Sequence, residues 1–120
     1  DWLASLASLT GATMPKNTAP DSYNYLGSWL GKEKTDRPWV IEQASNHTLS
    51  VRTKDWKYIE PSDKPALEHW TKMETGNNPQ PQLYDLSVDP SEKENLAGTH
   101  PDKVKELAIL LEKVKAAKTK

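Results

Sequence analysis

Residues 48–59, with the sequence TLSVRTKDWKYI, decide the fold of this 120-residue chain. Apolar and polar side chains alternate in the first half of the stretch, so Leu49 and Val51 share one face of a strand. A second strand pattern covers residues 56–59, and only residues 54 and 55 separate the two. A connection this short joins neighbouring strands of opposite direction, so the stretch predicts an antiparallel hairpin.

Two further strands flank this hairpin. Residues 39–44 are apolar and then mixed, and residues 82–86 form a second short stretch of the same kind. Between the hairpin and the last strand, residues 62–81 are polar and contain three prolines. This composition predicts a long loop, with one helical turn around residues 67–70.

Helix signals surround the predicted strands. Residues 1–9 place their apolar side chains on one face, and Gly11 follows as a stop residue. Residues 21–30 predict a shorter second helix. Residues 89–92, DPSE, have the form of a helix-capping box with proline in the first turn, and they predict one or two helical turns that end before Gly98.

The last helix is predicted to begin within residues 99–102 and to carry one apolar stripe at helical spacing. A helix of this length must bury such a stripe to be stable, and one face of the sheet is its natural partner. Trp56 and Tyr58 share a strand face and are predicted to pack under it. The sequence therefore predicts an α+β fold, with N-terminal helices and a four-stranded antiparallel sheet packed against a C-terminal amphipathic helix. The stripe consists of Val104, Leu107, Ala108, Leu111 and Val114.

The composition excludes several classes of function. The chain has 16 basic and 17 acidic side chains, so no net field attracts nucleic acid or an anionic membrane surface. No apolar run approaches the roughly 20 residues that span a bilayer. Cysteine is absent, which removes disulfides, thiolate metal sites and thiol catalysis. Because the first residue is Asp1 and not methionine, we expect a piece of a longer or processed chain.

Four motifs resemble those of a known family. Residues 83–97, LYDLSVDPSEKENLA, are similar to the C-terminal signature of sulfatases, L-Y-D-L-x-x-D-P-x-E-x-x-N-L-A. Residues 51–59 resemble the tryptophan-containing hairpin of that family. Residues 1–15 and 21–32 resemble two of its helical segments. The four motifs occur in the family's order over nearly the whole chain, so the chain resembles the C-terminal region of an arylsulfatase-type sulfatase of the alkaline phosphatase superfamily.

The resemblance implies a division of the chain. Residues 1–35 are expected to form the helical end of the sulfatase catalytic domain. Residues 36–120 are expected to form the small C-terminal subdomain, in which a four-stranded sheet packs on the last helix. The catalytic domain of the same full-length chain is then the expected partner, with sulfated carbohydrate as the substrate.

The resemblance also implies a mechanism for the full-length protein. Sulfatases hydrolyse sulfate esters with a formylglycine, made from Cys or Ser in a C/S-x-P/A-x-R motif, beside a calcium ion. This chain has no such motif, so it is expected to hold no catalytic residue, metal ligand or cofactor and to be inactive alone. By family resemblance, the full-length protein is expected in the periplasm or outside the cell.

Four residues are candidates for substrate contacts, since loops of this subdomain can border the pocket in sulfatases. Asn46 and His47, with Gln43 beside them, lie in the turn before the hairpin, and Arg52 lies on the polar face of its strand. Trp70 lies in the long loop and is the candidate for stacking on a sugar ring.

Two other interpretations remain open at this point. The chain could be a stand-alone carbohydrate-binding module that uses Trp29, Trp39 or Trp70. It could also be an α+β interaction domain. If it is severed from a catalytic domain, an exposed apolar surface is expected to favour self-association.

Overall fold

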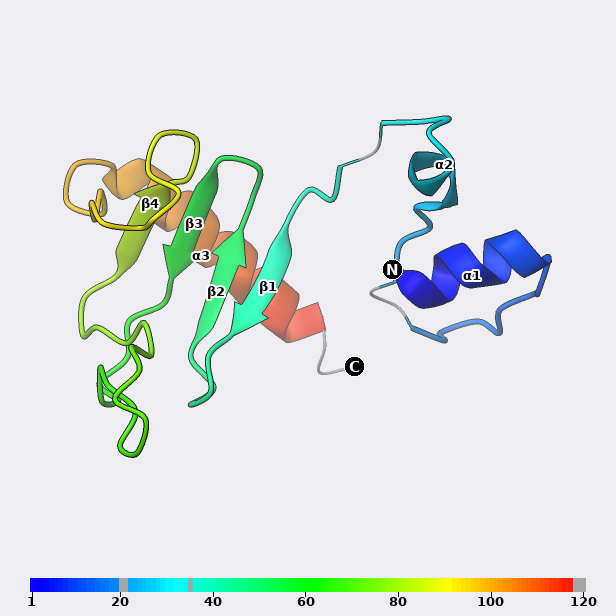
Figure 1. Cartoon of the computed structure of the whole chain (residues 1–120). Coiled ribbons are helices and arrows are strands. Elements are labelled where there is room, and N and C mark those ends of the chain that lie inside the picture. Colours follow the sequence, from blue (N-terminus) through cyan, green and yellow to red (C-terminus); the bar gives the residue numbers. More distant parts are fainter. Residues whose placement is uncertain (20–21, 35, 118–120) are drawn as a thin grey trace. The chain divides into compact units, whose positions relative to one another are not determined.

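The computed structural model describes residues 1–19, 22–34 and 36–117. The chain forms two compact units, Asp1–Arg37 and Pro38–Lys120. Figure 1 shows the helices of the first unit and the sheet and long helix of the second. The assignment of the first unit to a catalytic domain stays a prediction.

The N-terminal unit contains two short helices, α1 (Trp2–Thr10) and α2 (Leu26–Trp29). Helix α1 ends at Gly11, whose φ of 71° lies in the left-handed region. Glycine occupies that region without the steric cost of a Cβ atom, so the predicted stop signal acts as expected.

Helix α2 is much shorter than the predicted helix over residues 21–30, of which residue 21 lies outside the described part. The N–H of Tyr23 donates to Asp1 Oδ1 at 3.0 Å, and the N–H of Tyr25 donates to Ser5 Oγ at 2.8 Å. These bonds hold the segment before Leu26 in a non-helical course against α1. Helical spacing alone could not reveal them, because the acceptors lie about 20 residues away.

The C-terminal unit is built on a four-stranded antiparallel sheet with the order β1-β2-β3-β4. The strands are β1 (Val40–Gln43), β2 (Leu49–Arg52), β3 (Trp56–Ile59) and β4 (Gln82–Asp85), and helix α3 (Pro101–Ala117) follows them. Figure 1 shows α3 crossing one face of the sheet. The predicted α+β architecture is therefore confirmed.

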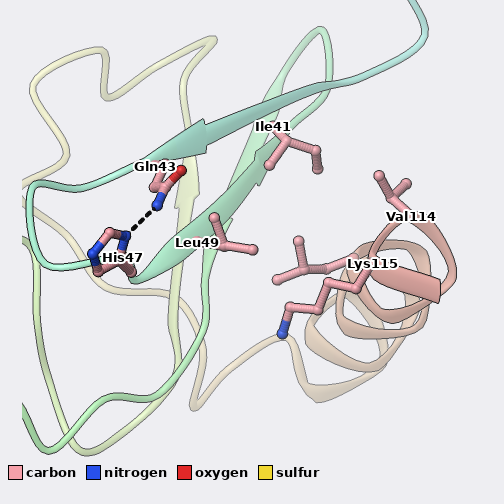
Figure 2. Close-up of a pocket in the computed structure, with 7 residues that line it drawn as sticks. Ile41, Gln43, His47, Leu49, Val114 and Lys115 are labelled. Atoms are coloured by element: carbon pink, nitrogen blue, oxygen red, sulfur yellow. Dashed lines mark hydrogen bonds between the residues drawn. The ribbon is translucent and has the colours of Figure 1, made fainter. Parts of the chain in front are cut away.

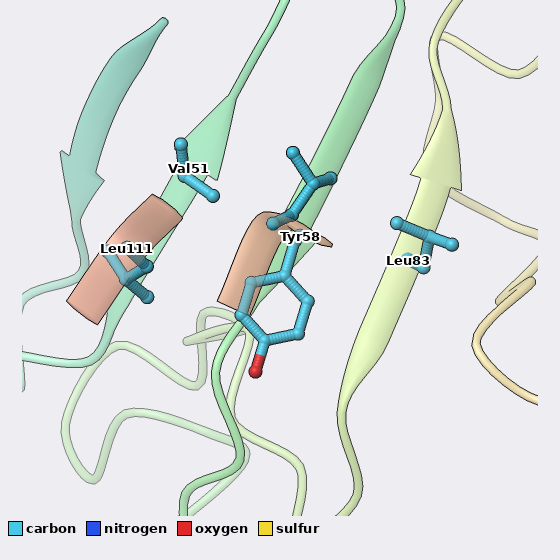
Figure 3. Close-up of a cluster of buried hydrophobic side chains, with 5 residues drawn as sticks. Val51, Tyr58, Leu83 and Leu111 are labelled. Atoms are coloured by element: carbon cyan, nitrogen blue, oxygen red, sulfur yellow. The ribbon is translucent and has the colours of Figure 1, made fainter. Parts of the chain in front are cut away.

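The core lies between the sheet and α3, where apolar side chains from three strands meet the helix (Figure 3). Trp56 packs against this cluster, beside the buried Tyr58, as predicted. Burial of each such side chain contributes about 1.5–3 kcal/mol before the entropy cost of ordering it. The buried cluster consists of Val51, Tyr58, Leu83, Leu107 and Leu111.

The helical turns predicted for residues 89–98 are absent. Asp89 Oδ2 does accept the N–H groups of Lys93 and Glu94, at 2.7 and 2.8 Å. Glu92, however, has a φ of 54°, which interrupts a right-handed helix, and its carboxylate bonds Lys57 at 2.9 Å. The prediction was wrong because a contact to the sheet outweighed the local capping pattern.

No helix in the described part of the chain is long and apolar enough to cross a membrane.

Candidate functional site

Three segments gather at one end of the sheet: the β1–β2 turn, the loop between β3 and β4, and the last turns of α3 (Figure 1). Lys64 Nζ, in the long loop, donates to the carbonyl oxygen of Asn46 in the turn. Lys115, near the end of α3, forms an ion pair with Glu60 at the start of the same loop. This end of the sheet therefore collects loops from distant parts of the sequence.

His47 in the β1–β2 turn and Gln43 at the end of β1 are both exposed to solvent. His47 has a φ of 71°, and its N–H donates to the carbonyl of Ala44 at 3.0 Å. Its Nδ1 lies 2.7 Å from Gln43 Nε2 (Figure 2). In the tautomer that carries its proton on Nε2, Nδ1 accepts this bond from the amide nitrogen, which can only donate. An oxygen of a ligand can accept a hydrogen bond from the N–H at Nε2.

A pocket of about 310 Å³ opens beside this pair, between β1, β2 and α3 (Figure 2). Its volume is at the lower end of the range typical of small-molecule sites. The polar groups that line it come from Gln43, His47 and Lys115. The apolar side chains are those of Ile41, Leu49, Leu111 and Val114.

Lys115 brings little net positive charge to the pocket. Burial lowers the pKa of Lys115, but hydrogen bonds to Glu112 and Glu60 outweigh it and leave the pKa raised. The ammonium group therefore stays charged but is paired with two carboxylates. The pocket suits a neutral or hydrogen-bonding group better than an isolated anion.

Trp70 lies in the long loop and is 84% exposed. For the helical turn predicted around residues 67–70, the structure shows a single turn in which the N–H of Lys72 donates to the carbonyl of Glu68 at 3.1 Å. An isolated antiparallel bridge between Leu67 and Glu74 closes the segment. Glu68 accepts the N–H groups of Trp70 and Thr71 at 2.6 and 3.1 Å, which directs the chain into a turn. The backbone bonds from Thr71 and Trp70 lower the pKa of the Glu68 carboxyl.

Arg52 lies at the opposite end of β2 from His47. Its neighbour Val51 is buried against α3, so alternation along the strand places Arg52 on the other face of the sheet. There it lines a small pocket of about 130 Å³ with Glu42, Lys57 and Glu92. The structure therefore brings Asn46, His47 and Gln43 together, adds the Trp70 loop at the same end, and separates Arg52 from them.

Lys57 forms the centre of a polar cluster that the sequence interpretation missed. Its Nζ lies 3.1 Å from Glu42 and 2.9 Å from Glu92, and its side chain is only 17% exposed. Burial lowers the pKa of Lys57, but the bonds to Glu92 and Glu42 outweigh it and raise the pKa overall. The carboxylates come from positions far apart in the chain, so no local pattern announces the cluster.

No group of three or more His, Asp or Glu side chains able to hold a metal ion occurs within residues 1–19, 22–34 and 36–117.

Comparison with known proteins shows which group this chain resembles. No family model matches it. An N-acetylgalactosamine-6-O-sulfatase of Bacteroides thetaiotaomicron is 55% identical over 115 residues, which are 96% of this chain and 22% of that protein. Arylsulfatase K of Mus musculus is 36% identical over 112 residues, which cover 85% of this chain and 18% of the mouse protein.

Solved structures give the same result. One, described with the metabolism of multiple glycosaminoglycans by Bacteroides thetaiotaomicron, superposes with a TM-score of 0.92 and 54% identity, over 97% of this chain and 24% of that one. A 2-O GAG sulfatase superposes with a TM-score of 0.66 and 25% identity, over 98% of this chain and 24% of that one. The chain thus spans about a quarter or less of the length of these relatives and matches their C-terminal part.

Proposed function

Because this chain is homologous to the C-terminal region of sulfatases, we propose that the whole protein hydrolyses sulfate esters of glycans. The observation that carries this proposal is a match of more than half of the residues in sequence together with a match of the fold. Identity of 55% extends over 115 residues, and a solved structure with 54% identity superposes with a TM-score of 0.92. If the chain were a free-standing binding module, there would be no reason for its similarity to sulfatases to extend over both units.

The substrate we propose is a 6-O-sulfated N-acetylgalactosamine in a glycosaminoglycan. The name of the relative with 55% identity supports the sugar and the position, and the description of the structure with 54% identity supports the class of glycan. The arylsulfatase K relatives support only the broader activity, because they are less similar.

Within this protein, the chain has a structural role and borders the substrate pocket. It holds no cysteine and no serine in a formylglycine motif, so the formylglycine and its calcium ion belong to another part of the protein. Asn46 and His47 are the proposed contacts to substrate at the open end of the sheet. By family resemblance we propose that the protein works in the periplasm or outside the cell.

The N-terminal unit supports a partner within the same polypeptide. The rings of Trp2 and Trp29 meet at a tilt of 48° with centroids 4.8 Å apart, yet the two residues are 73% and 43% exposed. No charged side chain occurs from residue 2 to residue 15, so the exposed apolar residues of α1 have no charged neighbours in sequence after Asp1. We propose that the catalytic part of the same chain covers them. The other exposed apolar residues here are Leu3, Leu6, Leu9 and Leu30.

The test is sulfate release by the purified full-length protein from three substrates: N-acetylgalactosamine 6-sulfate, its 4-sulfate isomer and N-acetylglucosamine 6-sulfate. We expect the first to have the highest kcat/KM, by at least about tenfold, which corresponds to one hydrogen bond or clash in the pocket. Preference for another of these substrates would overturn the sugar and position. No sulfate release from any sulfated glycan would overturn the activity itself.

A further inference from the structure

The loop between β3 and β4 carries large apolar side chains into solvent. Leu67, Trp70 and Met73 are 51%, 84% and 66% exposed. Tryptophan combines a large apolar face with an N–H donor. A ligand that covers this face removes it from water, which stabilises the complex. An 84% exposed Trp in a well-formed loop therefore indicates a surface that meets something else.

Hydrogen bonds hold this loop in one shape before any ligand binds. The Glu68 carboxylate accepts two of these bonds. The N–H of Glu68 also donates to the carbonyl of Met73 at 2.8 Å, next to the bridge between Leu67 and Glu74. The rings of His69 and Trp70 meet edge to face, with centroids 4.8 Å apart. A preorganised aromatic loses little conformational entropy on binding, which favours affinity.

The base of the loop is fixed to the sheet. Asn77 is 7% exposed, and its Nδ2 donates to the carbonyl of Pro65 at 2.9 Å. Its Oδ1 accepts from Thr48 Oγ1 at 2.6 Å, at the start of β2. Because Thr48 directly follows His47, the loop that carries Trp70 and the turn that carries His47 share one rigid support.

Charged side chains of both signs surround Trp70, which favours a hydrated ligand over a protein interior. His69 and the exposed Lys72 lie within two residues of it, and so does Glu68, while Glu74 lies four residues away. The exposed face of the N-terminal unit differs, because charges are absent there over 14 consecutive positions, from 2 to 15. The two exposed apolar regions thus call for different occupants.

We propose that Trp70 stacks on a pyranose ring of a sulfated glycan, next to the ring that bears the scissile sulfate. This inference rests on the proposed function and deepens it by assigning a specificity-determining residue. The apolar C–H groups of the sugar lie on the indole face, and Lys72 and His69 lie beside its acidic substituents. Trp70 therefore distinguishes oligosaccharides from sulfated monosaccharides and takes no part in bond cleavage.

The experiment compares Trp70→Ala and Met73→Ala in the full-length protein. Met73 is the matched control, because it is a large exposed side chain of the same loop. For each variant, kcat/KM is measured with N-acetylgalactosamine 6-sulfate and with a tetrasaccharide that ends in it. We expect the ratio of oligosaccharide to monosaccharide kcat/KM to fall roughly three- to tenfold in Trp70→Ala and to stay constant in Met73→Ala.

An unchanged ratio in Trp70→Ala would overturn the inference. A fall in melting temperature of the full-length Trp70→Ala protein, with the ratio unchanged, would instead place Trp70 against the rest of the polypeptide. If the wild-type protein releases no sulfate, the proposed function fails by itself. Calorimetric titration with the tetrasaccharide then decides the inference: it holds if Trp70→Ala weakens binding roughly three- to tenfold, and it fails if the wild-type and variant bind alike.

Discussion

At the scale of single residues, Leu111 shows how the apolar stripe of α3 holds the C-terminal unit together. Leu111 is 1% exposed, whereas Ile109 on the same helix is 59% exposed. We expect Leu111→Ala to lower the free energy of unfolding by about 2–5 kcal/mol, because it removes buried methyl groups and leaves a cavity. Ile109→Ala, the control, should change it by less than about 0.5 kcal/mol. Urea denaturation of both variants checks this, and equal effects would contradict the described core.

Lys57 makes stability depend on alkaline pH. Burial lowers the pKa of Lys57, but its bonds to Glu92 and Glu42 outweigh this and raise the folded-state pKa above the ordinary 10.5. The folded state therefore binds the proton more tightly, so this stabilisation is complete below about pH 10.5 and is lost as the pH rises through the folded pKa.

The matched variant is Lys57→Met, which keeps the apolar stem and removes the charge. Burial also raises the pKa of Tyr58 and of Tyr84, so both proteins should lose stability at high pH. The informative quantity is the difference in free energy of unfolding between wild type and variant. We expect it to stay constant up to about pH 10 and to shrink as the pH rises further, and a difference that stays constant at higher pH would show that the Lys57 pairs do not form.

At the scale of secondary-structure elements, Asn77 anchors the long loop to the sheet. Asn77→Ala removes the bonds to Thr48 and Pro65, and it leaves buried polar groups without partners. We expect faster amide hydrogen exchange over residues 64–77 with little change in the amides of β2 and β3. Asn78→Ala is the control, since that residue is exposed. Uniform acceleration over the whole unit would mean that the loop is not a separate element.

The regular elements could be predicted from sequence, because their signals are local. Alternation indicated the hairpin, and helical spacing identified the stripe on α3 that includes Leu107 and Leu111. The failures have a common cause. Helix α2 begins late because residues before it bond to α1, and residues 89–98 are not helical because Glu92 bonds Lys57. Such contacts link positions far apart in sequence and override local propensity.

The candidate site was only partly accessible to the same reasoning. Asn46 and His47 share a turn, so their proximity followed from sequence. That the Trp70 loop lies at the same end of the sheet depends on the contact between Lys64 and Asn46, which no periodicity indicates. The placement of Arg52 at the other end follows from the length of β2, and this could have been anticipated.

At the scale of the whole molecule, the two units differ in how they are stabilised. The C-terminal unit contains the sheet, α3 and the buried apolar cluster. In the described part of the N-terminal unit, Ser5 is the only buried residue, and α1 spans nine residues. Residues 38–120 should therefore unfold cooperatively when expressed alone, whereas a peptide of residues 1–37 should show little helix, because short helices need a packing partner.

Circular dichroism of the two pieces checks this expectation. A sigmoidal thermal transition for residues 38–120 and a featureless one for residues 1–37 are the expected results. A stable helical peptide 1–37 would contradict the proposal that its apolar face needs the rest of the polypeptide as a partner.

The proposed role of this chain, as the non-catalytic C-terminal part of a sulfatase, can be tested directly. The measurement is sulfate release from N-acetylgalactosamine 6-sulfate by two purified proteins: the full-length polypeptide and residues 1–120 alone. We expect turnover by the full-length protein and none above background by residues 1–120. Turnover by residues 1–120, or its absence from the full-length protein, would contradict this role.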